Sequence, residues 1–251
     1  MIKSIARFFL KFCLYTCLFS LGLFLILFLL YDEPVPEGKQ GVQADRLAQK
    51  MLDRVNIKGW EKTRYVEWSF MGMHHFMWDR KRHLVEVRWS NYSALFNPST
   101  LEGNVYHKDV LVQENQAALI ETAYGYFTND AFWMNAFTQI YQGDTELRYV
   151  ALEDGKEGLL VSYLSGGVTP GDSYLWILDE TGLPTAWKMW VNVLPIGGLQ
   201  VSWEDWETLE SGAMYAKSHK SGPFNVSITN FKSYQNWKKG GHESDPFSSI
   251  L

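Results

Sequence analysis

The sequence predicts an α+β protein in which an N-terminal transmembrane helix precedes a curved antiparallel β-sheet, a half-barrel, with helices packed on it. Three observations predict this fold: an uncharged apolar run near the N-terminus, one amphipathic segment after it, and many short aromatic-rich segments separated by turn residues. Aromatic residues make up 16% of the 251-residue chain, which suits the half-buried surface of a sheet.

The run Phe12–Tyr31 is long enough to cross a bilayer. About 20 residues at a rise of 1.5 Å span the hydrocarbon core of ~30 Å. Lys3, Arg7 and Lys11 precede the run and acidic residues follow it. Because positive charge stays on the cytoplasmic side, we expect a single pass through the bacterial inner membrane. The N-terminus would lie inside and the C-terminal domain in the periplasm or outside.

The end of this run does not resemble a cleavage site. A secretory signal has an apolar stretch of about 7–15 residues and ends in a small-x-small pattern. Here the run ends in Leu29-Leu30-Tyr31, and neither Cys13 nor Cys17 follows the small residues of a lipoprotein signal. An uncleaved signal-anchor over 1–31 is therefore expected, with a cleaved signal and a lipidated form as the alternatives.

Charge and cysteine content exclude several functions for the exported part. It carries 20 basic and 28 acidic residues, a net charge of −8. This balance argues against binding nucleic acid and against docking on anionic lipid. Both cysteines lie within the apolar run, so the exported part can form neither a disulfide nor a Cys-ligated zinc site.

A linker at 32–41, containing Pro34 and Pro36, leads into a domain predicted over 42–237. The domain begins with an amphipathic helix at Val42–Val55, whose apolar residues recur every three or four positions. Gly59 is expected to end this helical region.

Strands follow this helix, and a helical insertion is expected at about 114–141. The first predicted strands are Arg64–Met71, His74–Asp79 and Leu84–Trp89, with loops at 97–100 and 102–104. The insertion reads as two helices, Glu114–Tyr126 and Asp130–Tyr141, with Thr128 or Asn129 capping the second.

The remainder predicts an antiparallel meander and then a flexible tail at 238–251. Its expected strands are Glu146–Glu153, Gly158–Leu164, Ser173–Asp179, Thr185–Leu194, Leu199–Thr208, Ala213–Lys217 and Phe224–Tyr234. The glycine-rich segment Gly166–Asp172 joins strand to strand and is not followed by a helix, which favours a turn over a phosphate-binding loop.

This order of elements, over Gln43–Tyr234, resembles the lipoprotein-carrier superfamily typified by LolA and LolB. The segments Ser165–Trp176, Trp187–Trp190 and Leu194–Leu199 are also similar to parts of uncharacterised bacterial envelope proteins. The resemblance implies an incomplete antiparallel barrel with a helical lid that holds acyl chains. The chain departs from LolA in keeping an anchor and from LolB in lacking a lipobox.

Large apolar side chains on both faces of the segment Thr185–Leu194 indicate that both faces are covered, and a half-barrel can leave a cavity. We therefore expect an apolar ligand, a lipid or acyl group, to bind without chemical conversion between the sheet and the helices near 118–141. Ordinary core packing is the alternative for each aromatic residue. The candidate lining residues are Trp133, Phe137, Trp176, Trp187, Met189 and Trp203.

Catalytic and metal signals are weak. On a regular strand Glu204 and Trp206 share one face, while Trp203, Asp205 and Glu207 share the other, so a glycan-active enzyme or a glycan-binding domain is one alternative. An envelope scaffold or assembly protein is another. The six histidines lack metal-ligand spacing, and neither a metal, a cofactor nor a specific protein partner is predicted.

Overall fold

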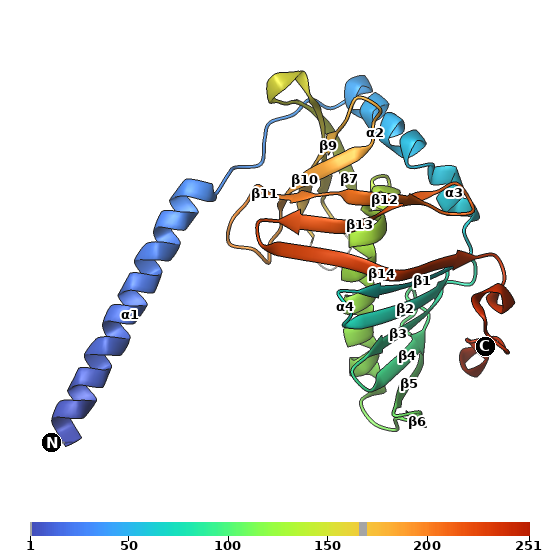
Figure 1. Ribbon diagram of the computed structural model, residues 1–251, viewed down its shortest axis with the longest axis horizontal. Helices are drawn as coiled ribbons and strands as arrows, with labels where there is room; N and C mark the ends of the chain where they lie inside the picture. The colour runs from blue at the N-terminus through green and yellow to red at the C-terminus, as the bar shows by residue number, and fades with distance from the viewer. Residues whose placement is uncertain (1, 166–169) are drawn as a thin grey trace.

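Helix α1, Ile2–Tyr31, projects away from the rest of the chain in the computed structural model, which describes residues 2–165 and 170–251 (Figure 1). Its segment Phe9–Tyr31 is long and apolar enough to cross a membrane. The predicted N-terminal apolar helix is therefore confirmed. Residues 166–169, in the turn predicted at Gly166–Asp172, lie outside the described residues.

Two antiparallel sheets form the body of the protein. The first has nine strands in the order β12-β13-β14-β1-β2-β3-β4-β5-β6, and the second has five in the order β11-β10-β9-β8-β7. The first sheet contains β1 Tyr65–Phe70, β2 His74–Asp79, β3 Leu84–Trp89, β4 Tyr92–Phe96, β5 Gly103–His107, β6 Val110–Leu111, β12 Glu204–Thr208, β13 Met214–Ser221 and β14 Phe224–Tyr234. The second contains β7 Thr145–Ala151, β8 Glu157–Tyr163, β9 Ser173–Leu178, β10 Pro184–Trp190 and β11 Leu199–Ser202.

The two sheets meet at Trp203, the single residue between β11 and β12. The Trp203 N–H donates to the Thr185 carbonyl at 2.8 Å, on the side of the second sheet. The N–H of Lys220, on β13 of the first sheet, donates to Ser202 Oγ at 2.9 Å. One ribbon therefore belongs to both sheets, and together they curve without closing into a barrel, as the predicted fold class requires.

Irregular backbone at Trp203 and Asp205 changes which side chains share a face. Trp203 lies between β11 and β12, and Asp205 has a φ of 55°, while the β12–β13 pairing keeps one register from Glu204–Ser218 through Trp206–Ala216. The strict alternation of a regular strand does not hold across these residues. Trp203 and Trp206 therefore stack on one side, 5.7 Å apart, instead of lying on opposite faces as predicted.

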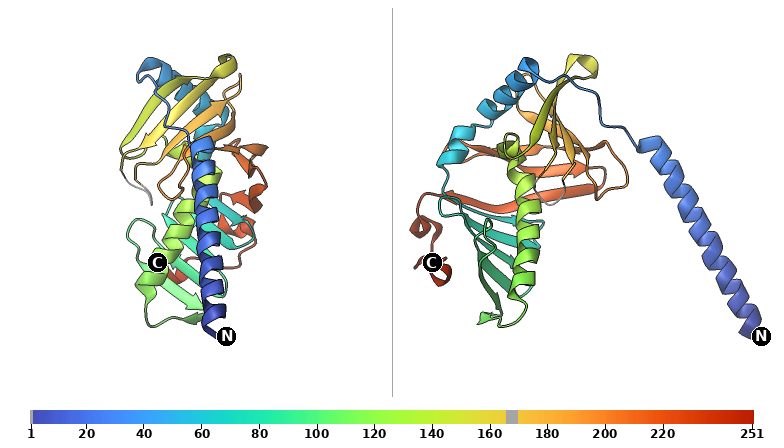
Figure 2. Two further views of the ribbon diagram at one scale, coloured as in Figure 1. Left: turned by 90° about the vertical axis from the view of Figure 1, so that its left-hand side faces the viewer. Right: turned by 180° about the vertical axis from the view of Figure 1, so that it is seen from behind.

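Helices cover the concave side of the sheets (Figure 2). Helix α2, Val42–Arg54, packs on β7 and β8, and α4, Gln116–Asn135, packs on β3, β4, β5 and β13. The α2 prediction is confirmed, with its apolar residues from Ala44 to Val55 buried. The described part of the chain also contains the short 3₁₀ segments η1 Ala136–Gln139, η2 Glu153–Gly155, η3 Trp237–Gly240 and η4 Ser248–Ile250.

Three local predictions are wrong. Gly59 lies inside a second short helix, α3 Ile57–Lys62, instead of ending the helical region. Helix α4 runs through Thr128 and Asn129 without a break, because Phe127 and Asp130 are both buried and hold this turn against the sheet. Strand β5 starts at Gly103, where a loop was expected; a Cβ there would lie 2.1 Å from the Leu95 carbonyl oxygen, so only glycine fits the pairing.

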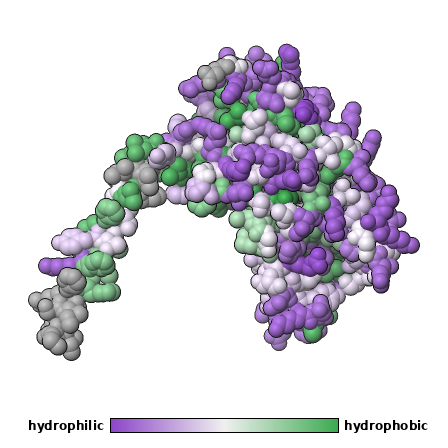
Figure 3. Space-filling view, viewed as in Figure 1, coloured by the Kyte–Doolittle hydropathy of each residue, from purple (hydrophilic) through white to green (hydrophobic). Residues whose placement is uncertain are grey.

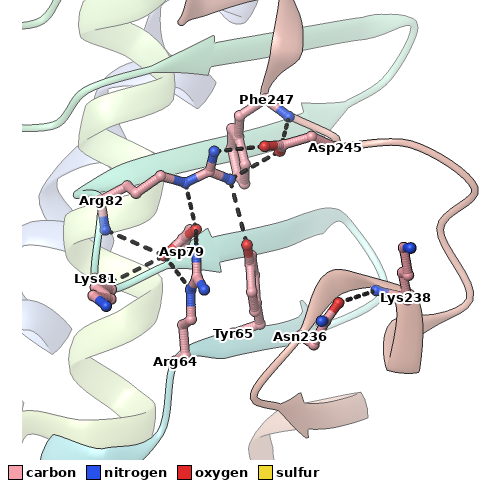
Figure 4. A network of polar contacts seen from close by, with 9 residues as sticks. All are labelled: Arg64, Tyr65, Asp79, Lys81, Arg82, Asn236, Lys238, Asp245 and Phe247. Carbon is pink, nitrogen blue, oxygen red and sulfur yellow. Dashed lines mark hydrogen bonds and ion pairs between the residues drawn. The ribbon is translucent and has the colours of Figure 1, made fainter.

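An ion-pair network holds the C-terminal segment against the β2–β3 turn (Figure 4). Arg82 donates from Nε to the Asp79 carboxylate at 2.6 Å and from Nη1 to the Asp245 carboxylate at 2.6 Å. Burial alone would raise the pKa of the fully buried Asp79, but hydrogen bonds from Arg64 and Arg82 outweigh it and hold the pKa below its usual range. The network thus keeps a buried carboxylate charged and paired.

Phe247 is fully buried beneath this network. It packs in a small cluster with Tyr65, Met77 and Tyr234, and the Arg82 guanidinium lies 5.6 Å from its ring centroid. The segment expected to be a flexible tail at 238–251 is therefore packed in the structure, because one aromatic residue and one aspartate attach it to the sheet.

We predict that Phe247→Ala lowers the free energy of unfolding by about 3 kcal/mol, the usual effect of removing a buried aromatic ring. Urea unfolding of the full chain in detergent, followed by Trp fluorescence, measures this change. Leu251→Ala, at a residue that is 74% exposed, is the matched control and should change the value by less than ~0.5 kcal/mol. Equal effects of the two substitutions would show that the segment is not packed.

An apolar cavity between helix α4 and the sheets

A cavity of about 810 Å³ lies between the C-terminal half of α4, the second sheet and the β13–β14 hairpin. Its volume falls within the range of about 300–1,000 Å³ typical of small-molecule sites. The wall is mostly apolar. Its apolar and aromatic residues include Phe132, Tyr174, Val191, Leu199, Val201 and Val226.

Three of the six candidate lining residues lie in the cavity wall: Trp133 on α4, and Trp187 and Met189 on β10. The other three, Phe137, Trp176 and Trp203, are buried behind the wall. Trp187 separates the two groups, since its ring centroid lies 5.0 Å from those of both Trp176 and Trp203. The rear aromatic residues therefore support the wall without facing the cavity.

The wall is an aromatic cluster built from three elements. The ring of Phe132 on α4 lies 5.0 Å from Tyr174 on β9 and 5.7 Å from Trp187 on β10. Tyr174 is the register partner of Met189, so β9 and β10 present these side chains to the same side. The sequence prediction missed Phe132 and Tyr174, although alternation along β9 and the apolar face of α4 both contained the signal.

Polar side chains also contribute to the wall, among them Thr128, Asn129, Gln139, Gln142, Ser165 and Ser221. His219 is buried, and burial lowers its pKa to about 4, which leaves the imidazole neutral at pH 7. The Tyr163 hydroxyl has no hydrogen-bond partner among the described residues, and burial raises its pKa. The Asp172 carboxylate accepts a hydrogen bond from the Asn192 backbone N–H at 2.9 Å. The described lining residues include no Lys or Arg, so the cavity is suited to an apolar group.

A buried pair fixes α4 above the cavity. His74 Nδ1 on β2 lies 2.7 Å from the Asp130 carboxylate, and Asn129 Nδ2 donates to the same carboxylate at 2.9 Å. The Tyr126 ring stacks on His74 with centroids 4.0 Å apart. Burial raises the pKa of Asp130, and the hydrogen bonds from Asn129 and His74 oppose that rise. Asn129 itself lines the cavity, so this contact positions the wall directly.

The carboxylates considered for glycan chemistry lie on the outer side of the sheet. Glu204 pairs with Lys220 and Glu207 with Lys217, each at 2.6 Å. These lysines lower the pKa of both glutamates, whereas a glycosidase acid needs a raised pKa. Asp205 and Glu207 border a separate, mostly polar hollow of about 530 Å³, away from the buried Trp203. Within residues 2–165 and 170–251, no group of three His, Cys, Asp or Glu side chains could hold a metal ion.

The solved structures that resemble this chain include a distant relative in fold. No family model and no curated protein sequence matches the chain. The structure is similar to that of a domain from Vibrio parahaemolyticus described as an outer membrane lipoprotein-sorting protein, with 8% identity and a TM-score of 0.31. The match covers 75% of this chain and 94% of that one.

We predict that His74→Ala lowers the free energy of unfolding by about 1–3 kcal/mol, because it leaves the Asp130 carboxyl buried without its main partner. A carboxyl with a raised pKa in the folded state favours folding at low pH, and this contribution is lost as the pH rises through that pKa. The free energy of unfolding of His74→Ala, taken relative to that of the double variant His74→Ala/Asp130→Asn, should therefore fall between pH 5 and pH 8 when measured by urea unfolding.

The double variant His74→Ala/Asp130→Asn is the control for this pH dependence. An amide at position 130 cannot ionise, so the additional loss between pH 5 and pH 8 should disappear. If the pH dependence persists in the double variant, it arises from another group.

Proposed function

We propose that this chain is a membrane-anchored, exported protein that binds an apolar ligand, a lipid or an acyl group, without converting it chemically. The observation that supports this proposal is the cavity of about 810 Å³ between α4 and the sheets, walled mostly by apolar and aromatic side chains. Binding would place the apolar part of the ligand against Trp133, Trp187 and Met189.

The physical reason for this ligand class is the match between wall and ligand. Removing apolar surface from water gives about 25 cal/mol per Å², so an acyl chain gains free energy on entering this cavity. A negatively charged ligand would lose its hydration without meeting an opposite charge, since the described wall has no Lys or Arg and His219 is neutral at pH 7.

The proposed location follows from α1 and its flanking charges. Basic residues precede Phe9–Tyr31 and acidic residues follow it, which favours an N-terminus inside the inner membrane and an exported domain. The outer-surface lysine pairs of Glu204 and Glu207 make a glycan-active enzyme the weaker proposal.

We predict that a brominated fatty acid quenches the Trp fluorescence of the delipidated full chain in detergent. Bromine quenches indole on contact, and Trp133 and Trp187 line the cavity. All 11 Trp residues follow residue 59, but Trp190 contacts Glu33 beside the end of α1, so the titration uses a Trp190→Phe chain, in which lipid bound only around α1 gives little signal. Titration gives an apparent Kd. The proposal fails if the quenching does not saturate or equals that of free tryptophan under the same conditions.

Filling the cavity tests where the ligand binds. The double variant Val191→Phe/Val226→Phe adds bulk to two lining residues and should weaken binding by about tenfold, or ~1.4 kcal/mol. Val110→Phe adds the same group on β6, at a residue that is 70% exposed, and should bind like the natural chain. Thermal melting of each variant checks folding. Equal weakening by the two variants would place the ligand elsewhere.

A further inference from the structure

The residues that follow α1 are tied to the β10–β11 connection. The Glu33 N–H donates to the Gly197 carbonyl at 3.2 Å, and the Gly197 N–H donates to the Asp32 carboxylate at 2.8 Å. The Glu33 carboxylate accepts from Lys188 Nζ at 2.6 Å. Its carbonyl accepts from Trp190 Nε1 at 2.6 Å. The two residues that follow α1 are therefore bound to β10 and to the β10–β11 connection of the second sheet.

Two glycines make this contact possible. A Cβ at Gly197 would lie 2.4 Å from Trp190 Cδ1 and 2.8 Å from the Glu33 carbonyl oxygen. A Cβ at Gly198, whose φ is +78°, would lie 2.7 Å from Glu33 Cβ. Any other residue at these positions would displace the chain that leaves α1.

The same connection forms part of the cavity mouth. Val193 and Leu194 belong to it, and Phe224 is the first residue of β14, directly after the β13–β14 turn; all three line the cavity. Val193 is 72% exposed and Phe224 is 75% exposed. The segments 191–198 and 221–224 contain no charged residue. We call Val193, Leu194 and Phe224 the rim. It lies on the side of the body that faces the end of α1, where Figure 3 shows hydrophobic surface.

The short chain between α1 and the rim limits how far the rim can lie from the membrane. Tyr31 ends α1 and Glu33 is already bound to the connection. Two residues span at most about 7 Å. The polar layer on each side of the hydrocarbon core is about 5–7 Å thick. A helix α1 that crosses the bilayer therefore places the rim at the level of the lipid headgroups.

We propose that the rim is seated in the outer surface of the same membrane that holds α1, so that a membrane lipid enters the cavity directly from the bilayer. This inference rests on the proposed function, because it assumes both the anchor and an apolar ligand. The occupant of the rim is the bilayer and not a second copy or another protein, because the contacts of Asp32 and Glu33 place the bilayer beside the rim. The net charge of −8 beyond residue 31 gives no electrostatic attraction to anionic lipid, so the contact is apolar.

Single labels on the rim test this contact. In a full chain carrying Cys13→Ser and Cys17→Ser, a cysteine is introduced by Val193→Cys, Phe224→Cys or Leu251→Cys and labelled with an environment-sensitive fluorophore. Leu251, at the C-terminus on the side away from α1, is 74% exposed and gives a matched control (Figure 1). Each chain is placed in phosphatidylcholine nanodiscs. At 193 and 224, doxyl-labelled lipid should quench strongly and aqueous iodide weakly; at 251 the order should reverse.

A longer linker tests whether the short tether produces the contact. Insertion of twelve Gly and Ser residues after Tyr31 leaves Asp32 and Glu33 in place but allows a separation of about 20 Å from the end of α1. Protection of the two rim labels from iodide should be partly lost, while quenching by the brominated fatty acid in detergent should not change.

The outcomes separate this inference from the proposed function. Iodide access to both rim labels, combined with normal binding of the brominated fatty acid in detergent, overturns the inference and leaves the proposed function standing. Protection from iodide without doxyl quenching means that a second copy or another protein covers the rim, and also overturns it. Doxyl quenching without fatty-acid binding in detergent supports the membrane contact and removes the proposed ligand.

Discussion

The bend at Trp203 is the feature on which the rest of the architecture depends. Strands β11 and β12 are one ribbon that pairs with β10 on one side of this residue and with β13 on the other. Trp203 is buried at the bend, and its ring lies 4.9 Å from Trp176 and 4.5 Å from His219. Because the ribbon turns here, the two sheets meet at an angle instead of forming one flat surface. The cavity is the space inside that angle, and α4 lies along its open side.

The cavity stays open because rigid side chains occupy the rear of this angle and leave the front unfilled. The rings of Trp176, Trp203 and Phe137 pack behind the wall residue Trp187, and all four residues are almost completely buried. The front of the wall carries smaller residues, such as Val191 and Val226. The buried His74–Asp130 pair prevents α4 from moving inward to close the gap. Packing density behind the wall and a fixed helix in front of it therefore maintain one apolar space.

Local periodicity predicted much of this fold, and non-local contacts decided the remainder. The three-to-four-residue spacing in Val42–Val55 and the alternation in Leu84–Trp89 were sufficient to locate α2 and β3. The irregular backbone at Trp203 and Asp205 and the pairing of Gly103 with Phe96 depend on how the strands pack against one another. For the site, alternation along β10 identified Trp187 and Met189, which line the cavity. The helical periodicity of the segment that contains Trp133 and Phe137 could not separate these two residues. Both occupy apolar positions, and only the angle between the sheets decides which one faces the cavity.

In the proposed function, the tether at Glu33 explains how a weakly apolar rim could hold a negatively charged domain against a membrane. Full burial of a side chain such as Val, Leu or Phe contributes about 1.5–3 kcal/mol, and the few rim residues would be only partly buried. That contribution is too small to bring a free domain to a bilayer against the loss of translational freedom. A span of two residues makes the contact intramolecular, at an effective concentration in the millimolar range, so a small free energy is sufficient. Because the free energy gained at the rim is small, its contact with the membrane is reversible. A lipid could therefore enter the cavity and leave it again.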